Sequence, residues 1–503
     1  MINGKDKILY ANRMIKTKIL IVGLYLIISF SISGNIYSQQ SRLDALGGLS
    51  YSILDIDSQL DPFVLGGNPA WMVNSQKEQR LEITPYGTNS NGDYHRYFES
   101  GNISNYGVNF MGLKPLGKGG TFRGYAGYNY QIQKERNKVL TLTPYTGEAY
   151  FFTDTTSGDF VYSGPTFEFM HSLEIFDNFY FGASVNYQIL DGLKKVYTYA
   201  QTLYRNVKGN VGIAYRFGNK FSVGLNYTIL DSQERIEASD VNLFTVITYL
   251  YRGETYRVEL RGSSQDFKLK KKGQIFGGQI FMNPTEKLFV GISAKYYPHN
   301  SSILIPQSSI VDHEDGYASF GQTDIKLQGR WIENNSLVFG FTGGYNYNNS
   351  WTRNSNNNLL IWEWDTSDKF LGGGVTFGNV AQTGYLVGAE YELHNINADS
   401  SKYIDNKESS LSVLNQIIRL GSEIKISSDV VLRLGYNLIF KEHDFLAGGN
   451  DVMWNNISVG AGINVSDNME IDIGSYYFTN SEKNKADSMN DIGLKVTLRF
   501  NKF

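Results

Sequence analysis

From residue 79 onward, the sequence repeatedly alternates apolar residues with small or polar ones over stretches of about ten residues. In the stretch 179–189, Phe179, Phe181 and Ala183 share one face, while Gly182 and Ser184 share the other. A period of two places successive side chains on opposite faces of a β-strand. The same pattern recurs at 221–229, 288–296, 337–345, 385–393 and 459–465. The sequence therefore predicts many strands, each with two chemically different faces.

Polar turns join these stretches in pairs, and longer connections separate the pairs. The predicted short turns are Lys114–Gly120, Asp177–Asn178, Gly218–Asn219, Asn283–Thr285, Asn334–Asn335, Gly378–Thr383, Ser427–Asp429 and Ser466–Asn468. The predicted long connections are 134–160, 231–255, 298–318, 348–367 and 394–411. Short turns at one end and long loops at the other are typical of an outer-membrane barrel.

The alternative to a membrane barrel is a soluble sandwich or propeller, because those strands also alternate. The alternating stretches here run for about nine to twelve residues, which suits a tilted membrane strand better than the usual soluble strand. The face opposite the apolar one is small and amide-rich, as in a wet lumen, and aromatic residues such as Tyr296, Tyr345 and Tyr477 lie near strand ends. We predict an all-β fold, a transmembrane antiparallel β-barrel of about 14 to 18 strands.

The C-terminal residues support this class. Alternation continues from Ile492 to Phe500, and the chain ends at Phe503, which is out of phase with it. This stretch resembles the C-terminal strand of bacterial outer-membrane barrels, which typically ends in an aromatic residue. The resemblance implies that Phe500 and Phe503 form an insertion signal, and that the barrel-insertion machinery and outer-membrane lipid are partners.

The N-terminus reads as a secretory signal peptide over residues 1–38. Basic residues precede an apolar run at 19–32 that is shorter than the roughly 20 residues of a spanning helix, so cleavage after Ser38 is favoured over a retained anchor. Either Met1 or Met14 can be the start. The chain has no cysteine, which excludes a disulfide-stapled domain and a lipoprotein anchor. Its formal net charge of −3 argues against a nucleic-acid partner.

Residues 39–78 precede the predicted barrel at 79–503. This segment holds Ala45-Leu46-Gly47-Gly48 and, some twenty residues on, Asn68-Pro69-Ala70. The pair of motifs resembles the N-terminus of the FadL-like long-chain fatty-acid transporters. In that family the segment folds into the lumen as a hatch, and hydrophobic substrates enter from outside. Gly67 and Trp71 depart from the residues usual in the family, and the expected strand count exceeds the family's.

The residues themselves also favour a hatch at 39–78 over a flexible periplasmic tail, since water would otherwise surround Leu65 and Trp71. Paired glycines permit close approach and unusual backbone angles, and proline fixes a turn. The hatch residues that we predict are Gly47, Gly48, Gly66, Gly67, Asn68, Pro69 and Trp71.

Chemistry-bearing motifs are weak. The 6 histidines are scattered without metal-ligand spacing, and neither His313-Glu314-Asp315 nor Glu442-His443-Asp444 accompanies a nucleophile motif. We therefore predict no catalytic residues, no metal, no cofactor and no enzymatic activity. Lys268–Lys272 is either a solvated strand end or a contact for lipid phosphates. Trp362 and Trp364, in a predicted loop, are either a platform for ligand contact, such as sugar stacking, or an interface anchor.

The predicted function is uptake of a hydrophobic or amphipathic small molecule through an outer-membrane barrel gated by the hatch. Residues 39–78 are too short for the folded plug domain of an energy-coupled receptor. One alternative is a non-transporting barrel that serves a secretion or surface-assembly complex, with proteins of that complex as partners. The other is a general porin with an open lumen.

Overall fold

The computed structural model describes residues 62–75, 79–194, 196, 198–218, 220–239, 245–306, 312–334, 336–378, 380–444, 448–483, 485 and 487–501. The predicted signal peptide at 1–38 lies outside the described residues, as do Gly47, Gly48 and Phe503. Within the described ranges, strands dominate and the helices are short. The predicted all-β fold class is confirmed.

A few short helical turns accompany the strands. These are α4 (Pro62–Gly66), η2 (Pro69–Trp71), α5 (Met72–Ser75), η3 (Gly117–Gly119) and α6 (Val380–Thr383). The strands are β1 (Arg80–Gly92), β2 (Asn102–Pro115), β3 (Thr121–Arg136), β4 (Tyr150–Thr153), β5 (Gly158–Phe176), β6 (Phe179–Lys194), β7 (Tyr199–Phe217), β8 (Phe221–Ser239), β9 (Val246–Arg252), β10 (Tyr256–Gly262), β11 (Ser264–Thr285), β12 (Leu288–Pro306), β13 (Asp312–Asn334), β14 (Leu337–Asn354), β15 (Leu360–Gly378), β16 (Tyr385–Lys402), β17 (Lys407–Lys425), β18 (Val430–His443), β19 (Asn450–Ser466), β20 (Met469–Glu482) and β21 (Ser488–Asn501).

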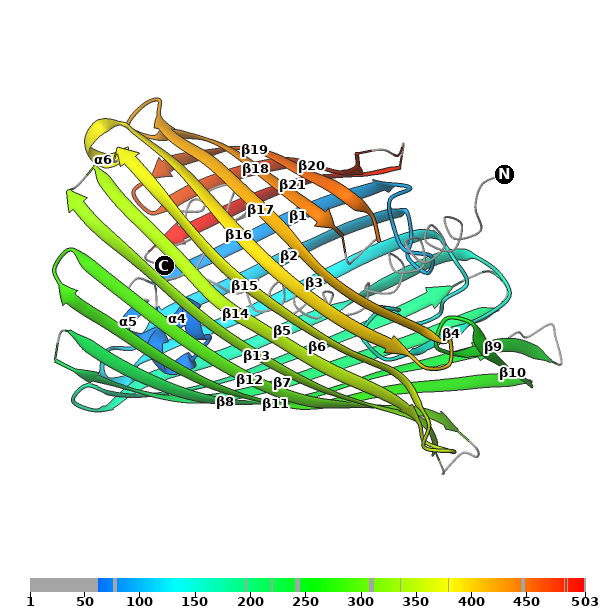
Figure 1. The fold of residues 1–503 in the computed structure, drawn as a ribbon. Helices are drawn as coiled ribbons and strands as arrows, with labels where there is room; N and C mark the ends of the chain where they lie inside the picture. Colours follow the sequence, from blue (N-terminus) through cyan, green and yellow to red (C-terminus); the bar gives the residue numbers. More distant parts are fainter. Residues whose placement is uncertain are drawn as a thin grey trace.

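Among the described residues, an 18-stranded antiparallel sheet closes on itself into a barrel (Figure 1). Neighbouring strands follow chain order, with β4, β9 and β10 set aside in a separate 3-stranded sheet. Closure comes from pairing of the first strand with the last, where Leu81 lies opposite Phe500 and Ile83 opposite Leu498. The strand number lies at the upper limit of the predicted range. A barrel of this size is wide enough for an aqueous channel unless something fills it.

Several connections predicted as long loops are in fact strand. β12 runs to Pro306 and β13 starts at Asp312, so most of 298–318 is paired. The same correction applies to 348–367 and 394–411, where β14 to β17 continue through the predicted loops. Most outward positions in these extensions are polar, so the apolar alternation ends although pairing does not. The strands thus extend beyond the belt that the alternation marks.

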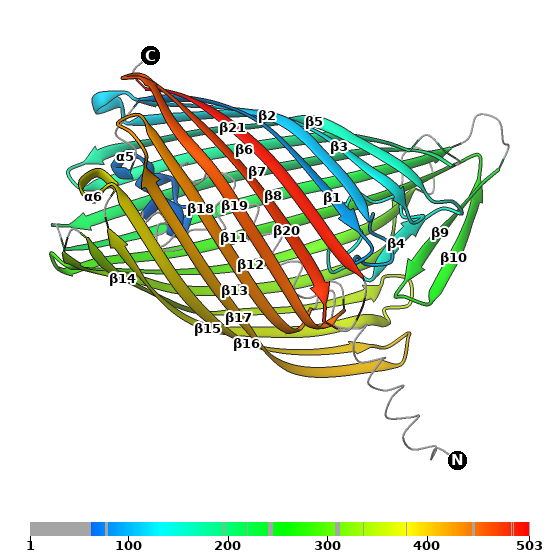
Figure 2. The same cartoon turned by 90° about the horizontal axis from the view of Figure 1, so that it is seen from above.

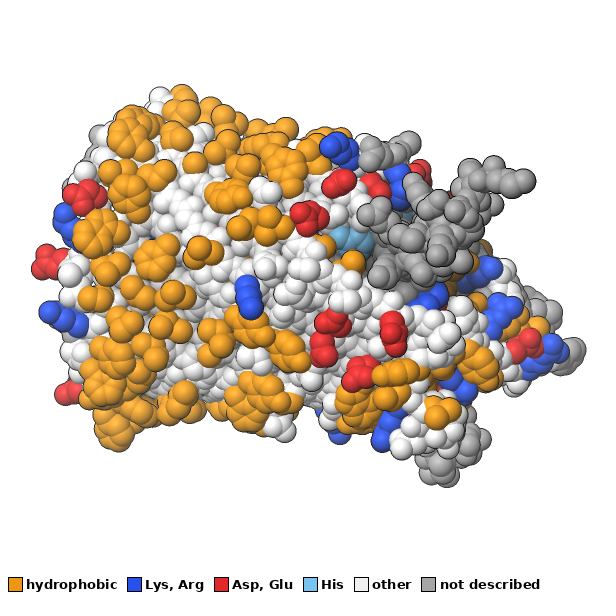
Figure 3. Space-filling model, in the orientation of Figure 1, with side chains coloured by type: hydrophobic (Ala, Val, Ile, Leu, Met, Phe, Trp, Pro, Cys, Tyr) orange, Lys and Arg blue, Asp and Glu red, His pale blue; other side chains and the backbone are white. Residues whose placement is uncertain are grey.

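The outer face of the barrel changes character along each strand. On β7, Val211, Ile213 and Phe217 point outward and are exposed, whereas the outward Arg205 pairs with Asp231 of β8 nearer the long-loop end. The apolar stretch 207–217 therefore has about the length that a tilted strand needs to cross a bilayer. Figure 3 shows hydrophobic side chains covering the part of the barrel nearest the short turns, with acidic and basic side chains mostly at the two ends. This belt identifies the surface that faces lipid.

Aromatic side chains mark the short-turn edge of that belt. Phe176 packs on Phe179, and Phe217 on Phe221, with ring centroids 6.3 Å and 5.5 Å apart. Exposed aromatic rings at the boundary of an apolar belt are typical of the membrane interface. Within the described part of the chain, none of the helices has the length and apolar character needed to span a membrane.

Both ends of the barrel contain other parts of the chain. Helices α4 and α5 lie within the short-turn end, and the sheet of β4, β9 and β10 lies at the long-loop end (Figures 1 and 2). Each end has its own cluster of buried hydrophobic side chains. The lumen is therefore occupied near both mouths.

The outward face of β7 offers a test of the membrane belt. Val211→Arg places a charge near the middle of the apolar stretch 207–217 and should destabilise the barrel by about 2 kcal/mol or more, whereas Gln201→Arg, outward on the same strand beyond the belt, should cost almost nothing. Urea unfolding of the barrel in lipid vesicles measures both. Equal effects of the two substitutions would show that the belt is misplaced.

Candidate functional site

The candidate site begins with the segment 62–75, which lies inside the short-turn end. Its centre is the 3-10 turn η2, where the Asn68 side chain caps the turn by accepting a hydrogen bond from the Ala70 backbone nitrogen at 3.0 Å. Pro69 occupies the first position of the turn, where its missing N–H is not needed. Before it, Gly67 has φ of 63°, a left-handed conformation that favours glycine. The Gly-Asn-Pro order thus builds a compact, capped turn.

Glycines on three adjacent barrel strands receive this turn. A Cβ atom at Gly182 on β6 would come within 2.3 Å of the Pro69 carbonyl carbon, and one at Gly212 on β7 within 2.0 Å of the Asn68 Oδ1 atom. At Gly224 on β8 a Cβ would lie 2.8 Å from the Trp71 Nε1 atom. The wall is smooth at these positions, and only glycine allows the turn to lie directly against the backbone.

Side-chain amides fasten the turn to the wall in a closed ring. The Asn68 Nδ2 atom donates to Gln279 Oε1 at 2.9 Å, and Gln279 Nε2 donates to Asn226 Oδ1 at 2.7 Å. Asn226 Nδ2 then donates to Asn210 Oδ1 at 3.4 Å, and Asn210 Nδ2 donates to the Gly67 carbonyl oxygen at 2.9 Å. We call these four side chains and the Gly67 carbonyl the amide ring. It links the segment to β7, β8 and β11 without any formal charge.

Further contacts around the amide ring hold the segment. The Asn68 Nδ2 atom also lies 3.1 Å and 3.2 Å from the carbonyl oxygens of Ile213 and Leu225. Ser172 Oγ donates to the Ala70 carbonyl oxygen at 2.9 Å and accepts from the Val73 nitrogen at 3.3 Å. These bonds join the segment to the backbone and side chains of the wall itself.

Apolar packing completes this end. Trp71 meets Phe281 edge-on, with ring centroids 5.5 Å apart, and both side chains are buried. Phe63, Leu65 and Met72 belong to the same cluster. Burial of such side chains contributes roughly 1.5–3 kcal/mol each, so the segment is bound firmly as well as specifically.

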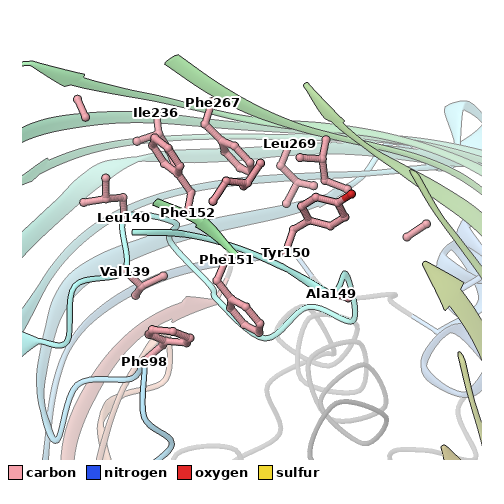
Figure 4. Close-up of a cluster of buried hydrophobic side chains, with 14 of the residues drawn as sticks. Phe98, Val139, Leu140, Ala149, Tyr150, Phe151, Phe152, Ile236, Phe267 and Leu269 are labelled. Atoms are coloured by element: carbon pink, nitrogen blue, oxygen red, sulfur yellow. The ribbon is translucent and has the colours of Figure 1, made fainter. Parts of the chain in front are cut away.

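The long-loop end is closed by a different chemistry. The connection between β3 and β5 folds into the mouth, where Val139, Leu140, Phe151 and Phe152 are almost fully buried (Figure 4). Phe152 stacks on the inward-facing Phe267 of β11 at 4.9 Å, with the rings nearly parallel. We call this connection, residues 137–157, the mouth plug. Sequence reasoning treated it as an open loop, although the non-alternating run Ala149–Phe152 was a signal for burial.

Ion pairs anchor the mouth plug to the barrel. Asp154 accepts from Lys194 Nζ at 2.5 Å and from the Thr198 nitrogen and hydroxyl. Glu148 lies 2.8 Å from Lys271 Nζ and accepts from Ser301 Oγ at 2.6 Å. Since one partner in each pair is almost fully buried, breaking either pair leaves a charge without compensation.

Burial by itself raises the pKa of Glu148, but the charge of Lys271 and the hydrogen bonds from Lys271, Ser301 and Thr146 outweigh it and hold the pKa below the usual 4.5. A carboxylate with a depressed pKa adds stability above its unfolded pKa and loses that contribution as the pH falls through the folded value. The Glu148 contact therefore persists as the pH falls to about 4.5 and is lost only below it.

The remaining predicted site residues fall in different places. Trp362 and Trp364 lie in strand β15, not in a loop, and point inward. They are 2% and 5% exposed and belong to the same buried hydrophobic cluster as the side chains of the mouth plug. Phe500 lies on β21 at the seam, half-buried. Gly66 lies against the Gln279 side chain. The ring partners Asn210, Asn226 and Gln279 were not predicted.

His313, His443 and the lysine run also lie in strands. His313 and His443 belong to β13 and β18 and not to long loops. Along β11, Lys268 and Lys270 reach Asp312 while Lys271 reaches Glu148, so the run contacts two carboxylates. Across the described ranges, no three His, Asp or Glu side chains gather as a metal site would require.

Comparison with known proteins identifies the family of this chain. The model of a family described as "Family of unknown function (DUF6850)" matches residues 69–370, more than half of the chain. No curated protein matches this sequence.

Several solved structures have a similar shape at low sequence identity. The Ralstonia pickettii toluene transporter TbuX is 10% identical, with 93% of this chain and 99% of that chain covered and a TM-score of 0.35. A Pseudomonas aeruginosa FadL homologue is 12% identical over 89% and 94%, with a TM-score of 0.34. The FrpB iron transporter from Neisseria meningitidis is 9% identical over 85% and 82%, with a TM-score of 0.43. With TM-scores below 0.5, these matches say nothing specific about substrate or gating in this chain.

We call Gly182, Gly212 and Gly224 the glycine wall. On β7, the effect of a glycine-to-alanine substitution should depend on whether the glycine belongs to this wall. Gly212→Ala should push the turn at Asn68 out of place, because the new methyl group overlaps Asn68 Oδ1, at a cost of about 1–3 kcal/mol. Gly209→Ala, an outward position on β7 with nothing within 4 Å, is the matched control. Hydrogen exchange by mass spectrometry over 62–75 should speed up in the first variant alone. Unchanged exchange in Gly212→Ala would rule out close docking.

A second prediction concerns the mouth plug. Glu148→Gln removes the partner of Lys271 and should loosen residues 137–157 by about 2 kcal/mol or more. Trypsin cleavage after the exposed Lys138 should then accelerate about tenfold or more, since the next residue, Val139, is buried in the intact plug. Glu259→Gln on β10 removes a carboxylate of an exposed pair and serves as control. Equal cleavage rates would mean that the ion pair does not hold the plug.

Proposed function

The chain belongs to DUF6850, a family of unknown function, and we propose that it is a bacterial outer-membrane channel for small amphipathic molecules, gated by residues 39–78. Uptake needs no covalent step. A molecule enters past the mouth plug and crosses the lumen. It leaves when the turn η2 moves away from the glycine wall.

The amide ring is the observation that carries this proposal. Buried apolar side chains such as Trp71 keep the segment in the lumen, whereas the ring that fixes the position of the turn consists of neutral hydrogen bonds, each of which contributes only about 0.5–1.5 kcal/mol net. Water or a polar ligand can replace such bonds at little cost because it offers the same donors and acceptors. The turn is thus docked in one defined position and remains exchangeable.

The lining of the lumen bears on the kind of substrate. Between the two closed ends, the inward positions of neighbouring strands carry mostly amides and charged groups. Examples are Asn129, Glu168, Asn186, Gln188, Asn206, Lys208, Lys295, Asp324, Asn346 and Glu392. Such a surface favours molecules with polar groups. Of the hydrophobic and amphipathic substrates that the sequence suggested, it favours the amphipathic ones.

The two alternatives predict other arrangements. A general porin needs an open lumen, and the docked segment 62–75 and the mouth plug argue against one. An accessory of a secretion or surface-assembly complex needs a permanently blocked lumen, and the uncharged, replaceable ring argues against that. Signal-directed export, insertion through Phe500 and Phe503, and contact with outer-membrane lipid belong to the proposal as well.

Conductance in planar bilayers tests the proposal. We expect the chain 39–503 to remain closed, and the form that lacks 39–78 to conduct once Glu148→Gln has loosened the mouth plug. Asn68→Ala, which removes the cap and the bonds to Gln279, should give intermediate, flickering openings in the Glu148→Gln background. Gly209→Ala in the same background is the control and should stay closed.

Each outcome decides between the alternatives. Equal conductance of the chain with and without 39–78 would mean that the segment gates nothing, in favour of a general porin. Absence of conductance in every form, including the doubly opened one, would favour the accessory role.

A further inference from the structure

We propose that Lys208 and Lys295 form a binding site for the hydrophilic anionic head group of an amphipathic molecule, a hydroxyl-rich carboxylate or a phosphate, on the lumen side of the amide ring. This inference names the ligand class of the lumen and rests on the proposed channel function. It arises from two lysines, on β7 and β12, that face the same part of the lumen.

Strand register places both lysines inward. Lys208 lies opposite Asn186 and Leu230, and it shares its face with Asn210, two residues away. Lys295 lies opposite Gly277 on β11, which is two residues from Gln279 on the same face. Lys208 is therefore one inward position from Asn210 on the same strand, and Lys295 lies diagonally across from Gln279 on the neighbouring strand.

The two ammonium groups lack close partners. Among the described residues, neither Lys208 nor Lys295 forms a hydrogen bond or an ion pair within 4.0 Å, and Lys295 is close enough to affect Lys208 electrostatically. Two like charges in a confined lumen repel one another unless an anion lies between them. The pair is therefore arranged to attract a negative group.

Each lysine has one carboxylate within electrostatic reach, and each of these carboxylates also contacts another group. Glu168, the acidic side chain that acts on Lys208, lies 4.0 Å from Arg123 Nη1. Asp324, opposite Lys295, acts on that lysine electrostatically, and its two oxygens accept from Gln322 Nε2 at 2.9 Å and 3.2 Å. Three cations and two carboxylates leave this part of the wall with an excess of positive charge.

An unused amide donor lies beside the lysines. The Asn186 Nδ2 atom is buried and has no hydrogen-bond partner among the described residues. Asn186 pairs directly with Lys208 across the two strands. A buried donor without an acceptor is costly, and an anion held by Lys208 provides one.

The surroundings of the two lysines favour a hydrophilic head group. Inward neighbours of the lysines include Gln188, Asn206 and Asn210, whose amides suit hydroxyl groups better than an alkyl chain. An anion here also lies next to Asn210, which holds the Gly67 carbonyl. Competition for Asn210 gives a ligand a direct way to weaken the amide ring.

Calorimetric titration of the purified chain 39–503 in detergent tests the site, with glucuronate, inorganic phosphate, butyrate and glucose as probes. Glucuronate combines a carboxylate with hydroxyl groups and should bind more tightly than butyrate or glucose. In the double variant Lys208→Gln, Lys295→Gln, glucuronate affinity should fall about tenfold or more, because charge-assisted bonds to both lysines are lost. Phosphate affinity should fall in parallel.

Matched variants separate charge from folding. Lys208→Arg with Lys295→Arg keeps both charges and should retain affinity within a few-fold. Lys220→Gln with Lys287→Gln removes two exposed charges at the short turns and should change nothing. Should the double glutamine variant fail to form a barrel, Lys208→Gln alone should still weaken glucuronate by about tenfold.

Two results would contradict the proposed binding site. One is equal glucuronate affinity in the wild-type chain and the lysine-to-glutamine variants. The other is binding of butyrate or glucose at least as tight as that of glucuronate. Conductance tests gating by residues 39–78, and the titrations test the lysine site. A negative result in one measurement therefore does not affect the interpretation of the other.

Discussion

Closure of the barrel is the constraint on which the rest of the structure depends. In a bilayer each unpaired backbone group costs several kcal/mol, so a sheet that crosses it must have no free edge. The pairing of β1 with β21 removes that edge. Closure at this strand number creates a wide lumen, and the inward face of every strand becomes a surface that has to be filled, hydrated or controlled.

The two ends of the lumen solve this problem with different chemistry. At the long-loop end, the mouth plug buries aromatic side chains and fixes carboxylates such as Asp154 and Glu148 on barrel lysines. At the short-turn end, the segment 62–75 buries Trp71 but orients itself by neutral amides. The amide ring is therefore the more exchangeable closure, and the lysine pair Lys208 and Lys295 lies directly beside it.

The local sequence pattern was sufficient to predict the fold but insufficient to predict the residues of the site. Alternation reports which residues face lipid, so it predicted the barrel and nearly its strand number. It underestimated strand length because, beyond the belt, outward positions such as Arg205 and Arg235 face water and break the apolar pattern while pairing continues. Predicting long loops at 298–318 and 394–411 was wrong for this reason.

The partners of the capped turn could not be found the same way. Asn68 reaches Gln279, 211 residues further along the chain, and an amide in a strand has no local signature that marks it as a partner. Gly182 and Gly212 likewise read as ordinary lumen-facing residues until the turn lies against them. Sequence therefore identified Asn68 and Pro69 as unusual, and three-dimensional register was needed to show what they contact.

Movement of the turn away from the glycine wall is the central claim, and a reversible cross-link tests it most directly. The chain has no native cysteine, so Ala70→Cys with Ser172→Cys introduces one pair where the Ser172 hydroxyl now meets the Ala70 carbonyl. In the Glu148→Gln background, uptake of glucuronate into proteoliposomes should stop when a disulfide or a short linker joins the two cysteines. It should recover when that cross-link is cleaved. Equal uptake in the joined and cleaved states would contradict gating by this segment.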